Sequence, residues 1–101
     1  MATTAKVLFR GAATTDTTTV LYTVPAATTA VVTSIVVSNT SGTDANFTLA
    51  FDDVAFTTTV TVGAFDSTVF DVKQVLDAAT TIKGGASVTD VTFHISGVEI
   101  A

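Results

Sequence analysis

Few residues of this 101-residue chain have the chemistry of a catalytic or metal-binding group. His94 is the sole histidine and cysteine is absent, which excludes a thiol nucleophile and a tetrahedral zinc site. A lone histidine on the polar side of a strand usually serves as a hydrogen-bonded surface or interface residue, and no Gly-x-Ser-x-Gly turn accompanies it. We therefore predict no catalytic residues and no enzymatic activity.

Calcium is the one metal for which the sequence supplies a set of oxygen ligands. Asp52 and Asp53 are adjacent at a predicted corner, and further aspartates stand at positions 66, 71, 77 and 90. Their spacing does not match a calcium-binding loop, whereas aspartates are common in turns. The pair Gly84-Gly85 lacks the Lys-Ser or Lys-Thr step and the helix start of a phosphate-binding loop, so we predict a turn there. No metal and no cofactor are expected.

The charge of the chain argues against nucleic acid as a partner. Its formal net charge is −5 at pH 7, and its four basic residues are scattered: Lys6, Arg10, Lys73 and Lys83. Binding to phosphates needs clustered Lys and Arg side chains. The beginning of the chain also lacks the basic and then apolar order of a signal peptide, so we expect no secretion by that route.

A long uncharged segment raises the alternative of a membrane-spanning helix. Residues 17–43 carry no charge, and residues 20–37 reach the length of about 18 at which such a helix becomes a candidate. Pro25, five Thr or Ser residues and the lack of a flanking aromatic belt argue against a helix. The segment instead predicts two strands around a corner at Pro25, and we expect no membrane partner.

The composition predicts an all-β protein. Thr occurs 23 times and Val 16 times, and these β-branched residues fit a pleated, half-buried surface better than a helix. Hydrophobic residues make up 48% of the chain and charged residues only 13%, so Thr, Ser and Ala must form much of the surface. The length allows one domain, residues 1–101, with residues 1–4 as either a flexible arm on a neighbouring molecule or a frayed end.

Extended segments alternate with turn signals along the chain. About eight short strands are predicted, at residues 5–10, 18–24, 29–39, 45–52, 54–62, 67–73, 80–83 and 88–100. Residues 74–79 are the one place for a helical turn, and Gly97 marks a bulge or the close approach of another strand. Short strands about ten residues apart, without a helical period, predict a single antiparallel β-sandwich of the jelly-roll kind.

The longest predicted strand, residues 29–39, has two semi-apolar faces. This pattern is expected when a partner sheet covers one face and another chain covers the other. The chain also has few of the Lys and Pro residues that protect sheet edges, so we expect burial in a homo-oligomer. Phe65, Val75 and Leu76 are the candidate interface residues, and the alternative is that they close the ends of the sandwich.

Several stretches resemble a known group of proteins. They are Leu21-Tyr-Thr-Val-Pro-Ala26, Thr28-Thr-Ala-Val-Val32, Ile35-Val-Val-Ser-Asn39, Phe47-Thr-Leu-Ala50 and Val91-Thr-Phe-His-Ile-Ser-Gly-Val-Glu-Ile100. With these stretches, which cover about half of its length, the chain is similar to small β-rich virion proteins of tailed bacteriophages, notably those of cyanobacterial and marine hosts. The resemblance implies a structural, non-enzymatic role in a virion that is assembled in the host cytoplasm.

Three functions are therefore open. The first is a head cement or decoration protein, a homotrimer by preference, that bridges neighbouring capsomers of the major capsid protein. The second is a tail, baseplate or fibre component of the same virion, which copy number would distinguish from cement. The third is a carbohydrate-binding module, which β-sandwiches commonly carry, although the chain has no Trp and only Tyr22 as a tyrosine for stacking on a sugar.

Overall fold

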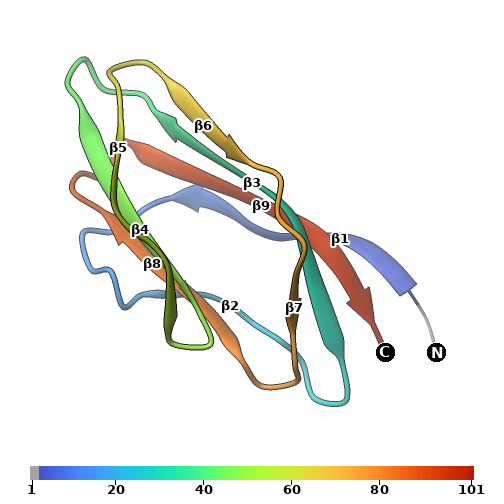
Figure 1. The fold of residues 1–101 in the computed structure, drawn as a ribbon. Coiled ribbons are helices and arrows are strands. Elements are labelled where there is room, and N and C mark those ends of the chain that lie inside the picture. The colour runs from blue at the N-terminus through green and yellow to red at the C-terminus, as the bar shows by residue number, and fades with distance from the viewer. Residues whose placement is uncertain (1–2) are drawn as a thin grey trace.

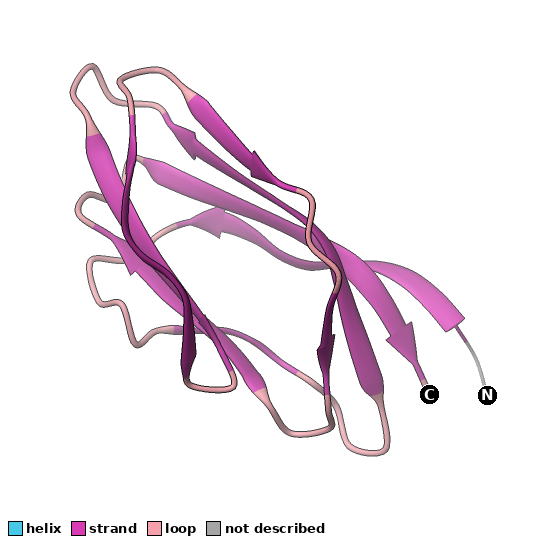
Figure 2. Ribbon diagram, in the orientation of Figure 1, coloured by secondary structure: helices cyan, strands magenta, loops and turns pink. Residues whose placement is uncertain are grey.

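The structure is a computed structural model and describes residues 3–101, apart from the side chain of Thr58. In this part of the chain there are nine β-strands and no helix (Figure 2). The strands are β1 (Thr3–Ala12), β2 (Val20–Thr23), β3 (Thr29–Asn39), β4 (Ala45–Phe51), β5 (Val54–Val62), β6 (Ser67–Phe70), β7 (Gln74–Leu76), β8 (Thr81–Ala86) and β9 (Val91–Ile100). The described residues accordingly include no helix that is long and apolar enough to cross a membrane.

The strands form two sheets that pack face to face (Figure 1). Sheet A has the order β1-β9-β3-β6, with β7 also paired to β3, and sheet B has the order β2-β8-β4-β5. All of these pairs are antiparallel. Because β6 and β7 both pair with β3, they act as one interrupted strand, and the two orders are then those of an eight-stranded jelly roll. The predicted all-β sandwich is confirmed.

The core lies between the sheets and takes alternate residues of the central strands. Phe47, Leu49 and Phe51 of β4 are buried, as their alternation with polar or small residues predicted. Phe93 of β9 and Phe70 of β6 meet the Phe47 ring edge to face, at centroid distances of 6.1 and 6.0 Å. These aromatic contacts join sheet B to sheet A.

Two β-bulges change which side chains reach the core. β3 has the predicted bounds, but its register to β9 shifts between Val32 and Ser34, which leaves Thr33 as an extra residue. The alternation restarts after it, so Val32 and Ile35 are both buried. A similar shift in β1 turns Leu8 toward the core. Each strand therefore exchanges its inner and outer positions part of the way along its length.

Gly84 and Gly85 lie within β8, so the predicted turn at this pair is wrong. Both residues are buried because other parts of the chain pass close to them. A Cβ atom on Gly85 would lie 2.5 Å from the carbonyl oxygen of Asp16 in the loop between β1 and β2. The lack of a side chain thus allows this loop to cover the strand, a role that local turn signals do not reveal.

Two further expectations about local structure are corrected. The helical turn predicted after β6 is wrong, because Gln74–Leu76 forms β7 and satisfies backbone groups of β3 at that edge. Thr3 and Thr4, predicted as part of an arm, belong to β1 and pair with β9. Met1 and Ala2, the rest of that predicted arm, lie outside the described residues.

Candidate interaction site

Phe65 projects into solvent from the loop between β5 and β6. Phe65 is 76% exposed, and its φ is 54°. A bulky residue in this left-handed region carries a backbone cost of about 1–2 kcal/mol. Exposure and strain both work against the stability of the isolated chain. Among residues 3–101, five other non-glycine residues, Ala27 included, also have a positive φ, so the exposed aromatic ring is what distinguishes Phe65. Phe65, which the sequence singled out, is therefore a candidate contact for a partner.

Hydrogen bonds hold the Phe65 loop against the neighbouring loop of residues 40–44. The Phe65 N–H donates to the carbonyl oxygen of Ser41 at 3.1 Å. The N–H of Ala64 donates to Asp44 Oδ1, also at 3.1 Å. The aromatic side chain is thus presented from a backbone that is fastened at two consecutive residues.

Asn39 supports both loops from inside the sandwich. It is the last residue of β3 and is only 2% exposed. Its Nδ2 lies 2.8, 3.2 and 3.3 Å from the carbonyl oxygens of Thr43, Val62 and Gly63. Its Oδ1 accepts hydrogen bonds from the N–H and the hydroxyl of Ser41. Asn39 had no predicted role: an asparagine before a turn indicates local hydrogen bonding, but the sequence does not show that two loops converge on it.

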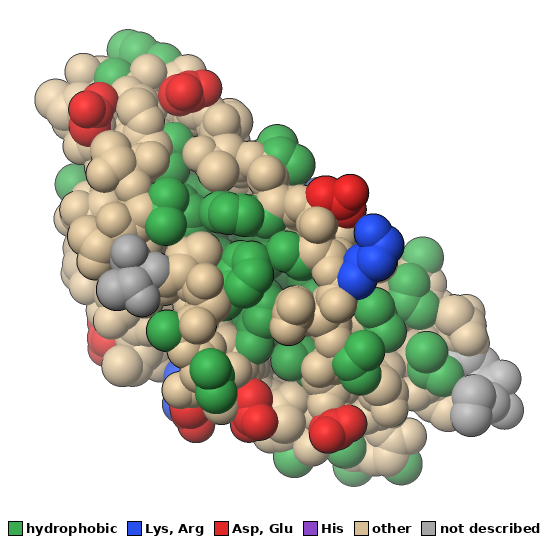
Figure 3. Space-filling view, in the orientation of Figure 1, with side chains coloured by type: hydrophobic (Ala, Val, Ile, Leu, Met, Phe, Trp, Pro, Cys, Tyr) green, Lys and Arg blue, Asp and Glu red, His purple; other side chains and the backbone are tan. Residues whose placement is uncertain are grey.

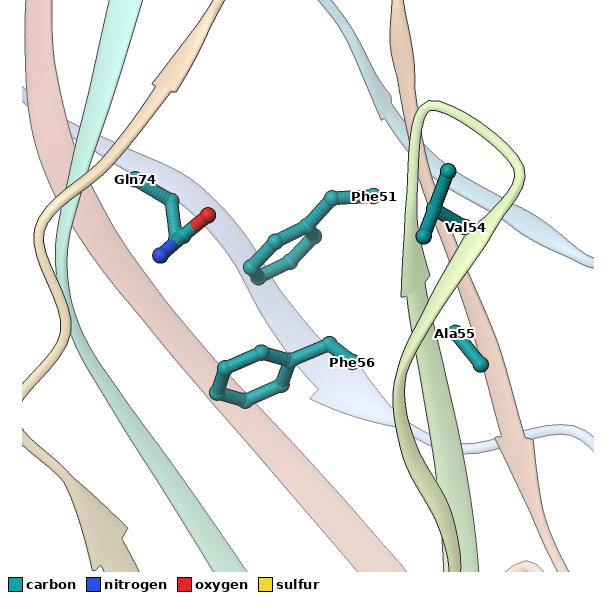
Figure 4. Close-up of a pocket in the computed structure, with 5 residues that line it drawn as sticks. All are labelled: Phe51, Val54, Ala55, Phe56 and Gln74. Carbon is teal, nitrogen blue, oxygen red and sulfur yellow. The ribbon is translucent and has the colours of Figure 1, made fainter.

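A small apolar pocket lies at the side of the sandwich where β5, at the edge of sheet B, faces β7 of sheet A. Figure 3 shows hydrophobic side chains gathered in the hollow of this side. The pocket has a volume of about 120 Å³ and is lined by Phe51, Val54, Ala55, Phe56 and Gln74 (Figure 4). The rings of Phe51 and Phe56 stack with their centroids 4.9 Å apart. The pocket therefore offers apolar contact and one amide, and its lining has no titratable group.

The three predicted interface residues do not form one site. Phe65 lies in the β5–β6 loop, whereas Val75 is in β7 and is 64% exposed. Leu76 is only 4% exposed and belongs to the core, so it packs within its own chain and is not available to a partner. This is the result of strand alternation in β7, which turns neighbouring residues to opposite sides. Phe65 and Val75 remain as candidate contacts.

The residues considered for metal binding or catalysis lie apart from one another. Within residues 3–101, no group of three or more His, Asp or Glu side chains is placed to hold a metal ion. His94 is in β9, where it pairs with Arg10 of β1. Asp52 and Asp53 form the turn between β4 and β5 with φ values of 53° and 59°, and Asp53 lies 2.7 Å from Lys83 Nζ. The predicted corner at these aspartates is confirmed.

A polar cluster connects the two sheets at Tyr22 of β2. Tyr22 is 9% exposed, and its hydroxyl donates a hydrogen bond to Glu99 of β9. Lys6 Nζ lies 3.3 Å from Glu99 Oε1. The hydrogen bond from Tyr22, assisted by Lys6, holds the pKa of Glu99 below its ordinary value, and burial raises the pKa of Tyr22. Because it is buried, Tyr22 is not free to stack on a sugar.

Glu99→Gln is expected to remove an acid-sensitive part of the stability. A carboxyl whose folded pKa lies below its unfolded pKa stabilises the fold above the unfolded value, and this contribution is lost as the pH falls through the folded pKa. The wild-type protein should be more stable than Glu99→Gln near neutral pH, and the difference should shrink as the pH falls below about 4. Urea unfolding at a series of pH values checks this expectation. A difference that stays constant with pH would contradict it.

The candidate sites on this structure are surfaces suited to contact with a partner. They are the Phe65 loop, the pocket beside Phe56 and the exposed part of β7 at Val75. Each presents apolar side chains. No protein-family model, no curated protein and no solved structure matches the chain.

Proposed function

We propose that this protein is a non-enzymatic structural component of a tailed-phage virion that cements the head by bridging neighbouring capsomers. Its strand segments resemble small β-rich virion proteins, and one structural observation carries the proposal further. Phe65 is held at a positive φ and is 76% exposed. A partner that buries Phe65 would gain the apolar contact that the isolated chain lacks. The partner we propose is the major capsid protein, with assembly in the host cytoplasm.

The shape and the charge of the molecule suit such a role. The described residues extend over 45 × 21 × 18 Å, so one elongated molecule can contact more than one neighbour. Charged residues are only 13% of the chain, and the centres of protein interfaces are depleted in charge. Cement of this kind adds buried interface between capsomers and so resists the outward pressure of packaged DNA.

Immunogold electron microscopy with an antibody to this chain tests the location. Dense labelling over the heads of phage particles supports the cement role. Labelling confined to the tail or its tip would replace it with the role of a tail, baseplate or fibre component. An absence of label, with the epitope shown to be accessible, would overturn the virion role altogether.

Phe65→Gly is expected to separate stability from attachment. Glycine adopts a positive φ without steric cost, so the isolated chain should become more stable by about 1 kcal/mol. Loss of the ring should weaken attachment to heads that lack the chain by about 30-fold, the effect of removing an interface anchor worth about 2 kcal/mol. Thermal unfolding measures the first effect, and co-sedimentation of the variant with such heads measures the second.

Ala27→Gly is the matched control for this variant. Ala27 has a φ of 56° and lies exposed in the loop between β2 and β3. The substitution relieves the same backbone strain without removing an aromatic ring. It should therefore raise stability to a similar extent and leave attachment unchanged. Equal attachment of the wild-type protein and Phe65→Gly would contradict the role given to Phe65.

A further inference from the structure

We infer that a second copy of this chain binds the outer face of sheet A, the face that points away from sheet B. The outer face is made by the side chains of β1, β9, β3, β6 and β7 that alternate with core residues. The inference goes beyond the proposed function: the same face meets itself in the two copies, so the contact is two-fold and gives a dimer, rather than the homotrimer expected of a head cement protein. The surface itself is argued from its apolar side chains, its charge and its size.

A row of aliphatic side chains crosses the outer face of sheet A. The pairing of the strands places Ala5, Val98, Val31 and Val75 next to one another, one residue from each of β1, β9, β3 and β7. Val75 is 64% exposed, and Val31 and Val98 are half-buried. Aligned across four strands, these residues leave a continuous apolar surface in contact with water.

A second row crosses the same face farther along the strands. It consists of Arg10, His94, Val36 and Val69, from β1, β9, β3 and β6. Val69 is 66% exposed. Val31 and Val36 are five positions apart, an odd separation that would place them on opposite faces of a regular strand; the extra residue at the bulge in β3 keeps them on one face. Val31 and Val36 in these rows belong to the second apolar face of β3. The sequence predicts that another chain covers this face.

The charges of the chain favour self-association through this face. Of its nine acidic residues, eight lie in loops or turns, and Glu99 is directed toward Tyr22 of sheet B. Within residues 3–101 no strand of sheet A therefore presents a carboxylate on the outer face, and Asp71, in the loop between β6 and β7, lies at the edge of the face beside Lys73. Two copies, each with a net charge of −5, can meet here without bringing carboxylates together. Arg10 is the one permanently charged side chain in the two rows, and the valines around it favour a second copy as the occupant over a strongly charged partner.

The size of the face is sufficient for a stable contact. Sheet A is four strands wide when β6 and β7 are counted as one interrupted strand. With strands about 4.8 Å apart and about ten residues long, at about 3.3 Å per residue, its outer face covers about 600 Å². Two such surfaces bury about 1,200 Å² in total, above the roughly 1,000 Å² expected of a specific interface. Asp71 and Lys73, 3.9 Å apart between β6 and β7, would lie at its polar rim.

The oligomeric state of the purified chain tests the inference. The double variant Val69→Asp/Val75→Asp introduces carboxylates at two highly exposed positions of the outer face. We expect the wild-type protein to be a homo-oligomer by light scattering, and the double variant to raise the dissociation constant at least about 100-fold, since each like-charge contact costs at least a tenfold factor. Circular dichroism shows whether the double variant folds. If it does not fold, Val75→Asp alone is used to measure the change in the dissociation constant.

Val20→Asp is the matched control. Val20 is 51% exposed, but it lies in β2 of sheet B and outside the pocket beside Phe56. This control should keep the wild-type mass. A wild-type protein that is monomeric throughout a concentration series, or a control that dissociates as readily as the double variant, would overturn the inference. Because no virion is involved, a negative immunogold result would remove the proposed function while leaving this interface supported by dissociation of the double variant.

Discussion

Asn39→Asp should lower the free energy of unfolding by about 3–5 kcal/mol, a large share of the 5–15 kcal/mol typical of a domain. The substitution keeps the shape of the side chain but replaces the Nδ2 donor with an oxygen. That oxygen would face the carbonyl oxygens of Thr43, Val62 and Gly63, now 2.8–3.3 Å from Nδ2. At 2% exposure the side chain is shielded from bulk solvent, so the carboxyl is either charged without a partner or protonated. Urea unfolding measures the loss.

The pH dependence of Asn39→Asp gives the prediction a second, independent readout. Burial raises the pKa of the introduced carboxyl in the folded state, so the variant should regain part of its stability as the pH falls and the group becomes neutral. Asn46→Asp makes the same chemical change at a partly exposed position in β4 and should alter stability by no more than about 0.5 kcal/mol. Equal losses in the two variants would show that Asn39 does not have the structural role described.

Gly97→Val should reduce stability by about 3 kcal/mol or more. Gly97 lies in β9 at the centre of sheet A and pairs with Lys6 of β1 and Val32 of β3. A Cβ at this position would be 2.3 Å from the carbonyl oxygen of Val31 and 3.0 Å from Leu8 Cδ1. The first of these atoms is backbone, so the added side chain can be accommodated only if β3 moves away from β9. Denaturant unfolding and the loss of β-sheet circular dichroism report this effect.

Gly42→Ala is the comparison for the Gly97 variant. An added Cβ at Gly42 would lie 3.6 Å from the Phe65 ring, which is ordinary van der Waals contact. The change should therefore affect stability by no more than about 0.5 kcal/mol. If Gly97→Val lowered the free energy of unfolding as little as Gly42→Ala, the close approach of β3 to β9 at Gly97 would not matter for stability.

Side-chain alternation predicts strands well wherever the pairing is regular. The β4 residues Phe47, Leu49 and Phe51 are buried together, and β3 has the bounds that its composition indicated. Alternation fails as a guide at a bulge. An extra residue such as Thr33 is recognised only from the pairing with the partner strand, and the sequence itself carries no signal for it. The sequence could therefore predict the buried face of β3 for only half of the strand.

Glycines show the same division between local and long-range information. Gly97 interrupts an otherwise alternating strand, and the close approach that this predicted is confirmed by its distance to the Val31 carbonyl. The pair Gly84-Gly85 has the signature of a turn, yet it lies in β8 because a loop from the beginning of the chain passes over it. That contact joins residues far apart in the sequence, and no local pattern records it.

The candidate contacts could be predicted only in part for a similar reason. Phe65 stands between turn residues, and the structure places it at the surface as that position indicated. Val75 and Leu76 could not be separated while residues 74–79 were expected to form a helical turn, since their opposite directions follow from the strand pairing of β7 with β3. The role of Asn39 depends on loops contributed by three parts of the chain, which only the fold brings together.

The central place of β9 in sheet A also determines when the protein can fold. β9 lies between β1 and β3, so these two strands do not pair with each other. β1, and the edge of β3 that does not pair with β6 and β7, must wait for residues made much later by the ribosome. Such long-range pairing is slow, and it leaves neutral, Thr- and Val-rich strands open to those of other nascent chains. A cell that makes many copies at once would therefore gain from spacing its ribosomes or from a chaperone that shields β1 and β3 until β9 arrives.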